Sequence, residues 1–187
     1  MADVDEGRNR TATAMTLYIS SISVDQVIEA LASFLAPMIP GGQVVRGQVN
    51  RVALPSNPCA VLTELLQVDL SVPAADYQPT DDTATIYGPS RIDVQIDFYG
   101  AQAGEFCKVA KSAFRSYWGF AQFPDGIKPL YTSDGVQAPL TTGEQQYESR
   151  WTLTASMQYN PTVTVPQQFA DEAEVTQTVA VDITMGL

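Results

Sequence analysis

Asp93, Gln95 and Asp97 alternate along the stretch RIDVQIDFYG, residues 91–100, and could offer oxygen ligands to a divalent metal ion. In an extended strand, alternate side chains share one face and lie about 6.6 Å apart. Ca²⁺ and Mg²⁺ require several more oxygen donors, and the sequence shows no third one of defined geometry. A second acidic pair, Asp81 and Asp82, lies among turn residues. The sequence therefore favours a solvated strand surface for the first group and an ordinary loop for the second.

Other residues that commonly perform catalysis are scarce. The chain contains no histidine, which removes the commonest general base and the commonest metal ligand. Cys59 and Cys107 have no neighbouring base and lie in apolar stretches, which predicts two buried thiols rather than a nucleophile or a disulfide. The segment GGQVVRG lacks the spacing of a phosphate-binding loop. We expect no catalytic residue, metal or cofactor, and a metal-dependent hydrolase using the four aspartates is the remote alternative.

The charge balance excludes further classes of function. A formal net charge of −11 argues against a protein that binds nucleic acid by neutralising phosphates, although DNA could still pass along its surface. No stretch approaches about 18 consecutive apolar residues, so we expect no transmembrane helix. The first 15 residues are polar and lack the apolar region of a signal peptide, which predicts a chain that stays in the cytoplasm where it is made.

Lys108, Lys111 and Arg115 form a positive patch in this acidic chain. They lie in 101–120, where a helix is predicted, and about 140–200° around it from Phe106 at about 100° per residue. Two interpretations stay open, a solvated helix face and a docking surface for an acidic neighbour. The predicted buried stripe of this helix is Ala103, Phe106, Ala110, Ala113, Phe114 and Tyr117.

An earlier helix is predicted within 23–42. Ser23 is a suitable N-cap with Gln26 completing a capping box, and Pro37, Pro40 and two glycines end the helix. Its apolar stripe is Val27, Leu31, Phe34, Leu35 and Met38.

Strands are predicted at 43–52, 58–70, 91–100 and about 129–132, and residues 71–90 are predicted to form a long acidic loop or a mobile excursion between strands. A run at 147–159 alternates over 13 residues, about 43 Å, which is twice a usual strand. Its wet face is rich in threonine and serine. Its apolar face is Trp151, Leu153, Ala155, Met157 and Tyr159, and Trp151 is predicted to anchor the core.

These elements predict an α+β fold, with a mostly antiparallel sheet, two helices packed on one face, and long C-terminal hairpin strands. Residues 1–15 are expected to be a disordered or extended tail, and 16–166 the core domain. Residues 167–187 are expected to form an acidic C-terminal arm with one strand, marked by the alternating residues Val175, Val179, Val181 and Ile183.

Four stretches carry a resemblance to a known family: SISVDQVIEALASFL, VVRGQVNRVALP, RIDVQIDFYGAQAGEFCKVAKSAFR, and the segment from FPDGIKPLYTSDG to QQFAD. In order and length they resemble the tail terminator, or neck terminator, proteins of tailed bacteriophages and prophages, from about Ser20 to Ala173. The motifs are structural rather than catalytic.

The resemblance implies a structural virion protein of the phage neck, assembled in the host cytoplasm. Such a protein forms a homohexameric ring that caps the tail tube, ends its polymerisation and offers a docking surface to the head connector. DNA passes through the ring without specific binding. The implied partners are the tail tube protein, the head–tail connector and neck proteins and, in a contractile tail, the sheath protein.

The resemblance also gives the polar strand faces a role, as the wall of a channel or an interface between subunits. The candidate residues are Arg91, Asp93, Gln95, Asp97, Arg150, Thr152 and Thr154. Lys108, Lys111 and Arg115 are the candidates for contact with a subunit or the tube. Another ring protein of the neck or baseplate, such as a head-completion, connector or sheath-terminating protein, is the alternative.

Overall fold

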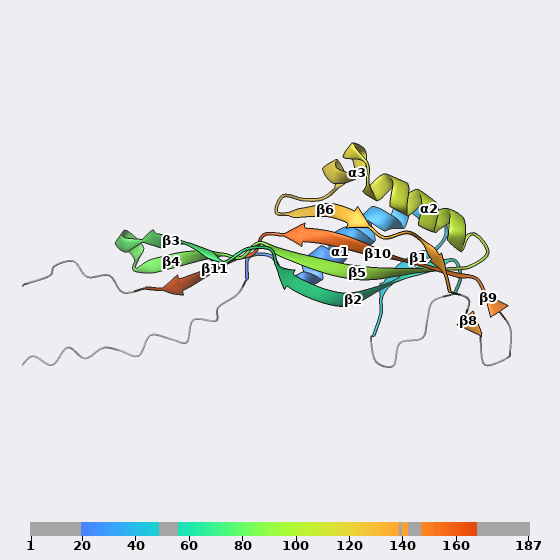
Figure 1. Ribbon diagram of the computed structural model, residues 1–187, viewed down its shortest axis with the longest axis horizontal. Helices are drawn as coiled ribbons and strands as arrows, with labels where there is room; N and C mark the ends of the chain where they lie inside the picture. The colour runs from blue at the N-terminus through green and yellow to red at the C-terminus, as the bar shows by residue number, and fades with distance from the viewer. Residues whose placement is uncertain (1–19, 49–55, 139, 142–146, 168–187) are drawn as a thin grey trace, which may run out of the picture.

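The computed structural model describes residues 20–48, 56–138, 140–141 and 147–167. The predicted tail at 1–15 and the alternating run at 175–183 lie outside the described residues. Within the described part, helices cover one face of a main sheet, and a narrow second sheet projects from one end (Figure 1). None of the helices described is long and apolar enough to cross a membrane.

The main sheet confirms the predicted, mostly antiparallel arrangement. Its middle strand β5 (Ser90–Tyr99) pairs antiparallel with β2 (Cys59–Asp69) on one side and with β10 (Arg150–Tyr159) on the other. The exception is β1 (Gln43–Arg46), which runs parallel to β2 along the outer side. The opposite side of β10 pairs with β6 (Ile127–Thr132) and β7 (Val136–Gln137).

Helix α1 (Val24–Leu35) begins at the predicted cap. The Ser23 hydroxyl accepts a hydrogen bond from the Gln26 backbone N–H at 3.3 Å, and the Gln26 side chain accepts one from the Ser23 N–H at 2.8 Å. This capping box satisfies two backbone donors at the start of the helix. Its buried side chains are Val27, Ile28, Leu31, Phe34 and Leu35. Met38 lies beyond the helix, in a short 3-10 turn, and is only half-buried.

The second predicted helix is two helices, α2 (Ala103–Phe114) and α3 (Tyr117–Gln122). Ser116 starts α3, because its hydroxyl accepts a hydrogen bond from the Gly119 N–H at 3.0 Å. Glycine is required there, since a Cβ would lie 2.1 Å from the carbonyl oxygen of Ala113. The break turns Tyr117 outward, where it is 88% exposed, so the prediction that Tyr117 is buried was wrong.

The core lies between the helical layer and one face of the sheet. Alternate β5 side chains point into it as predicted, and Ile96 lies in register between Leu62 of β2 and Leu153 of β10. Phe34 of α1 packs against Phe114 of α2, with ring centroids 6.0 Å apart. The buried residues of β5 on this face are Ile92, Val94, Ile96 and Phe98.

The segment predicted to be a long acidic loop at 71–90 is instead a β-hairpin. Strands β3 (Ala74–Gln78) and β4 (Thr83–Tyr87) are joined by the turn Pro79–Asp81, and β4 pairs on its other side with β11 (Thr162–Pro166). The loop prediction failed because the partner strand β11 lies far away in sequence, and the turn residues are concentrated at the hairpin tip.

This three-stranded sheet is called the arm below. Its strands continue the main-sheet strands β2, β5 and β10 past short junctions, so the arm projects from that end of the subunit (Figure 1). Backbone hydrogen bonds hold the junctions, from Leu70 N–H to the Pro89 carbonyl at 2.9 Å and from Gly88 N–H to the Pro161 carbonyl at 3.2 Å.

The strand predicted over 147–159 is interrupted. Tyr147–Glu148 forms β9, which pairs with β8 (Leu140–Thr141), and β10 begins only at Arg150. Ser149 lies between them, and its carbonyl accepts a hydrogen bond from Gly100 N–H at 3.2 Å. Alternation continues across the interruption, so the sequence pattern alone does not reveal it.

Candidate interaction surfaces

The sheet face opposite the helices carries a hydrogen-bonded polar layer centred on Asp97. This carboxylate is 4% exposed and lies in register with Thr152, whose hydroxyl donates to it at 2.5 Å. The guanidinium of Arg150 donates to the same oxygen from Nε at 3.1 Å and from Nη2 at 3.0 Å. The buried charge is therefore paired and hydrogen-bonded, as burial of a carboxylate requires.

The polar layer continues along β5 toward the arm. Asp93 accepts a hydrogen bond from the hydroxyl of Ser156 at 2.6 Å and one from Arg91 at 3.2 Å. Gln95 donates to Asp97 at 2.8 Å and lies opposite Thr154. The sequence prediction that these strand residues share a face is thus confirmed, but it missed that the charges neutralise one another within the subunit.

The four aspartates considered as metal ligands do not converge. Asp81 and Asp82 lie at the arm tip, whereas Asp93 and Asp97 lie in the main sheet and are occupied by hydrogen bonds within the sheet. No cluster of three or more His, Cys, Asp or Glu side chains suited to a metal ion occurs in the described part of the chain.

Both cysteines are buried thiols outside any disulfide, as predicted. Burial raises the pKa of the Cys59 thiol, and the nearby carboxylate of Glu148 adds to the effect. Burial also raises the pKa of the Cys107 thiol, against a smaller opposing effect of Lys111. Since the reactive form is the thiolate, these shifts make both cysteines poor nucleophiles at neutral pH.

The cations of α2 point away from the core, as their angular positions predicted. Lys108 and Arg115 are exposed, and Lys111 is half-buried because it forms an ion pair with Asp134. The hydrogen bond and charge of Lys111 hold the pKa of the Asp134 carboxyl below its ordinary value of 3.8. The pairing was missed from sequence because Asp134 belongs to a loop 23 residues further along.

A pocket of about 360 Å³ opens beside these cations. The indole of Trp151 lines it, and Gly104 leaves room for that ring, since a Cβ there would lie 3.1 Å from it. The prediction that Trp151 anchors the core is only partly met, because the ring is half-buried and packs at the core's margin. The residues around the pocket are Gly104, Glu105, Cys107, Lys108, Lys111, Gly135 and Trp151.

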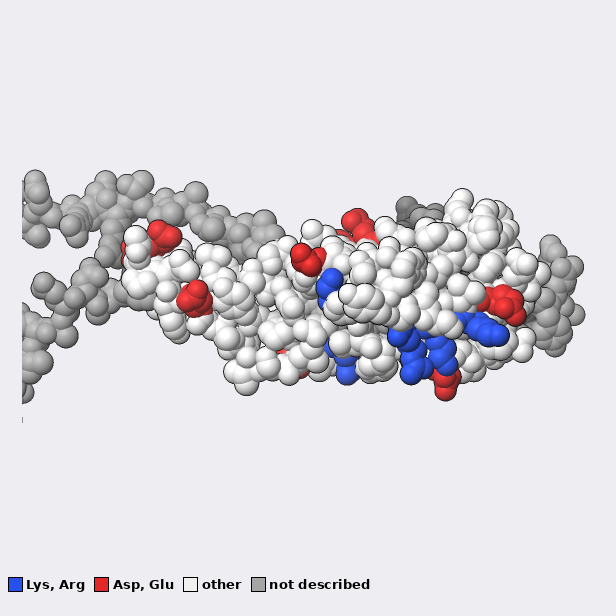
Figure 2. All heavy atoms as spheres, turned by 90° about the horizontal axis from the view of Figure 1, so that it is seen from above, with Lys and Arg blue, Asp and Glu red and all other residues white. Residues whose placement is uncertain are grey.

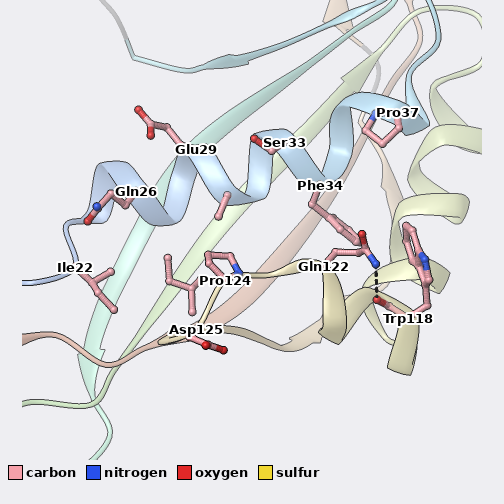
Figure 3. A pocket seen from close by; sticks show the side chains of 12 residues that line it. Ile22, Gln26, Glu29, Ser33, Phe34, Pro37, Trp118, Gln122, Pro124 and Asp125 are labelled. Atoms are coloured by element: carbon pink, nitrogen blue, oxygen red, sulfur yellow. Dashed lines mark hydrogen bonds between the residues drawn. The ribbon is translucent and has the colours of Figure 1, made fainter.

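A larger groove of about 560 Å³ separates α1 from α3 and the segment that follows it (Figure 3). Phe34 and Trp118 lie at one end, with ring centroids 6.0 Å apart, and Ile22 lies at the other end. Carboxylates of Glu29 and Asp125 stand on opposite walls. Trp118 is 53% exposed, so α3 presents aromatic surface beside this groove.

A further apolar surface lies on the second half of β2. β1 pairs only with Cys59–Leu62, so the rest of β2 has a single neighbouring strand, β5, within the described residues. Leu65 and Leu66 are each 51% exposed along this open edge. An open strand edge with apolar side chains is a template for pairing with another chain.

An α+β subunit with a neutralised polar sheet face, an open apolar strand edge and a projecting arm has the features of a structural assembly protein. The chain belongs to the phage neck terminator protein family, whose model matches residues 25–181. It is therefore a bacteriophage structural protein of the neck with a tail-terminating role, which confirms the family suggested by the sequence resemblance.

Among solved structures, the chain is similar to the PVC sheath/tube terminator of an extracellular contractile injection system, determined by cryo-EM in the extended state. The two share 12% sequence identity and superpose with a TM-score of 0.45, over 88% of this chain and 67% of the other. No match was found among curated proteins.

Proposed function

We propose that this protein assembles into a homohexameric ring that caps the finished tail tube and ends its polymerisation. The ring then presents the surface on which the head connector docks, and in a contractile tail it also holds the last layer of sheath. Assembly takes place in the host cytoplasm, and the finished ring stays in the virion at the top of the tail. The family membership supports the terminating role.

The observation that carries the oligomeric part of this proposal is the edge of β2 beyond Leu62, which no described strand other than β5 pairs with. Leu66 and Val68 lie in register with Asp93 and Arg91 on the sheet face away from the helices, and are 51% and 38% exposed. Exposed apolar side chains on an unpaired edge are costly in a free subunit. A neighbouring copy that covers this edge would remove both the apolar surface and the unpaired backbone groups from water.

The polar sheet face is the candidate wall of the channel. Arg91 and Arg150 are held by Asp93 and Asp97, so the charges of this face cancel. A surface whose cations are already neutralised offers no free positive charge to DNA phosphates. Thr152 and Thr154 keep the face hydrated, which suits DNA in transit.

The test uses the full chain, the tail tube protein and electron microscopy. Tubes capped by this protein should carry a sixfold ring at one end and should stop growing from that end when fresh tube protein is added. Tubes that elongate equally with and without the protein would contradict the terminating role. A ring of another order on a capped tube would contradict only the hexamer.

A pair of variants tests the β2 edge within the same assay. Leu66→Lys with Val68→Lys should prevent ring formation by placing charges on the open edge. Leu130→Lys is the matched control, because Leu130 is 43% exposed on β6, away from that edge. Ring formation by the double variant at the parental level would show that the edge is not an interface.

A further inference from the structure

Two cations on α2 differ from every other lysine and arginine that the structure describes. Arg46, Arg91, Lys111, Lys128 and Arg150 each form an ion pair with a carboxylate of the same chain. Lys108 and Arg115 form none with any described residue, and both are exposed on the outer face of the helix. Among the described residues, the subunit thus presents two positive charges outside any ion pair, one of which, Arg115, lies within electrostatic reach of Asp134.

The arm has the opposite character. Its described residues, 70–89 and 160–167, contain Asp76, Asp81 and Asp82 and neither lysine nor arginine. All three aspartates are exposed near the turn that joins β3 to β4, and none forms an ion pair with a described residue. In Figure 2 the charged side chains visible on the arm are all acidic, whereas the lysines and arginines gather over the helical half.

These two surfaces cannot neutralise each other within one subunit, because the arm projects from one end of the sheet and α2 lies over the body (Figure 1). A contact between the arm of one copy and α2 of another would join two different surfaces of identical subunits, which is a heterologous contact. Such contacts build a ring when their rotation closes.

We propose that the acidic tip of each arm docks on the α2 face of the next copy, with Asp76, Asp81 and Asp82 facing Lys108 and Arg115. This inference rests on the proposed ring and identifies the surfaces that join its members. The pocket lined by Trp151 also includes Lys108, so the arriving arm meets apolar surface beside that cation. Each exposed ion pair is weak alone, but repetition around a ring sets orientation and rejects wrong partners.

Reciprocal charge reversal tests the contact. One variant carries Lys108→Glu and Arg115→Glu, and the other carries Asp76→Lys and Asp81→Lys. Asp82 is left unchanged because its φ of 50° is one that lysine adopts poorly. At low salt, sedimentation velocity with and without tail tubes should show that each variant alone associates at least tenfold more weakly than the parent. Raised salt should weaken the parent in the same way.

An equal mixture of the two variants should recover assembly. In an alternating ring every junction is again complementary, since an unchanged arm meets an unchanged α2 and a reversed arm meets a reversed α2. Glu29→Lys with Asp125→Lys is the control for the arm variant, because it makes the same change in net charge away from both surfaces and should assemble like the parent. Thermal melts of each variant establish that the subunit is folded.

The docking inference is overturned if either reversed variant associates like the parent at low salt, or if the mixture assembles no better than its components. In that case a parental ring on the tube still supports the terminator function. If the parent itself fails to associate even on tubes, the ring and the docking contact are both overturned.

Discussion

The carboxylate of Asp97 lies directly opposite Thr152 in the sheet and accepts its hydroxyl hydrogen bond at 2.5 Å, while Arg150 donates twice to the same oxygen. One buried acid thus joins β5 to β10 on the face that is not covered by helices. The side chains most suggestive of a metal site in the sequence are therefore a structural element of the sheet.

Asp97→Ala should lower the free energy of unfolding by about 2 kcal/mol, because it removes charged hydrogen bonds and leaves Arg150 without its partner. Urea denaturation of the full chain measures the change. Thr154 lies on the same face, and the structure shows no hydrogen bond from its hydroxyl to a described residue. Thr154→Ala should therefore change the free energy of unfolding by less than about 0.5 kcal/mol. Equal losses for the two variants would show that the network is not a distinct source of stability.

Leu153→Ala should lower the free energy of unfolding by about 3 kcal/mol, because the side chain is 2% exposed and its loss leaves a cavity. Trp151→Ala should cost about 2 kcal/mol, less than a fully buried tryptophan, since part of the ring lies at the pocket. Thermal and chemical melts can rank the two. A larger loss for Trp151→Ala would mean that the indole is more deeply packed.

The Lys111–Asp134 ion pair predicts a pH dependence with a definite sign. The folded-state pKa of Asp134 is lowered, so its contribution to stability is present above the ordinary value of 3.8 and is lost as pH falls through the folded value. Lys111→Ala should let the Asp134 pKa rise toward 3.8, as NMR titration of the carboxyl carbon would measure. An unchanged titration would show that the ion pair is absent in solution.

Treatment with a chelator should leave the melting temperature and the assembly of the purified protein unchanged. Asp93 accepts a hydrogen bond from Ser156, and Asp97 is hydrogen-bonded to Thr152 and paired with Arg150. A bound metal ion is therefore not required to stabilise either carboxylate. Differential scanning calorimetry before and after metal removal makes the measurement. A fall of several degrees would return these aspartates to consideration as metal ligands.

The sequence by itself determined the elements whose signal is local. Ser23 and Gln26 lie three residues apart and form their capping box within one helical turn, and the alternation of Ile92 to Phe98 specifies which side of β5 is buried. The outward direction of Lys108 and Arg115 follows equally from helical geometry. Even the family could be inferred from the order of such segments.

Only the tertiary structure decided the features that depend on distant partners. The hairpin at 74–87 is completed by β11, a strand more than 70 residues later, and its turn-rich sequence resembles a loop until that strand is placed. Asp134 pairs with Lys111 across a shorter gap of 23 residues, while Lys108 and Arg115 form no ion pair with any described residue. A local sequence pattern indicates whether a segment forms a helix or a strand and which of its faces is buried. Which elements pair with one another depends on contacts between distant residues, and these contacts form only when the chain has folded.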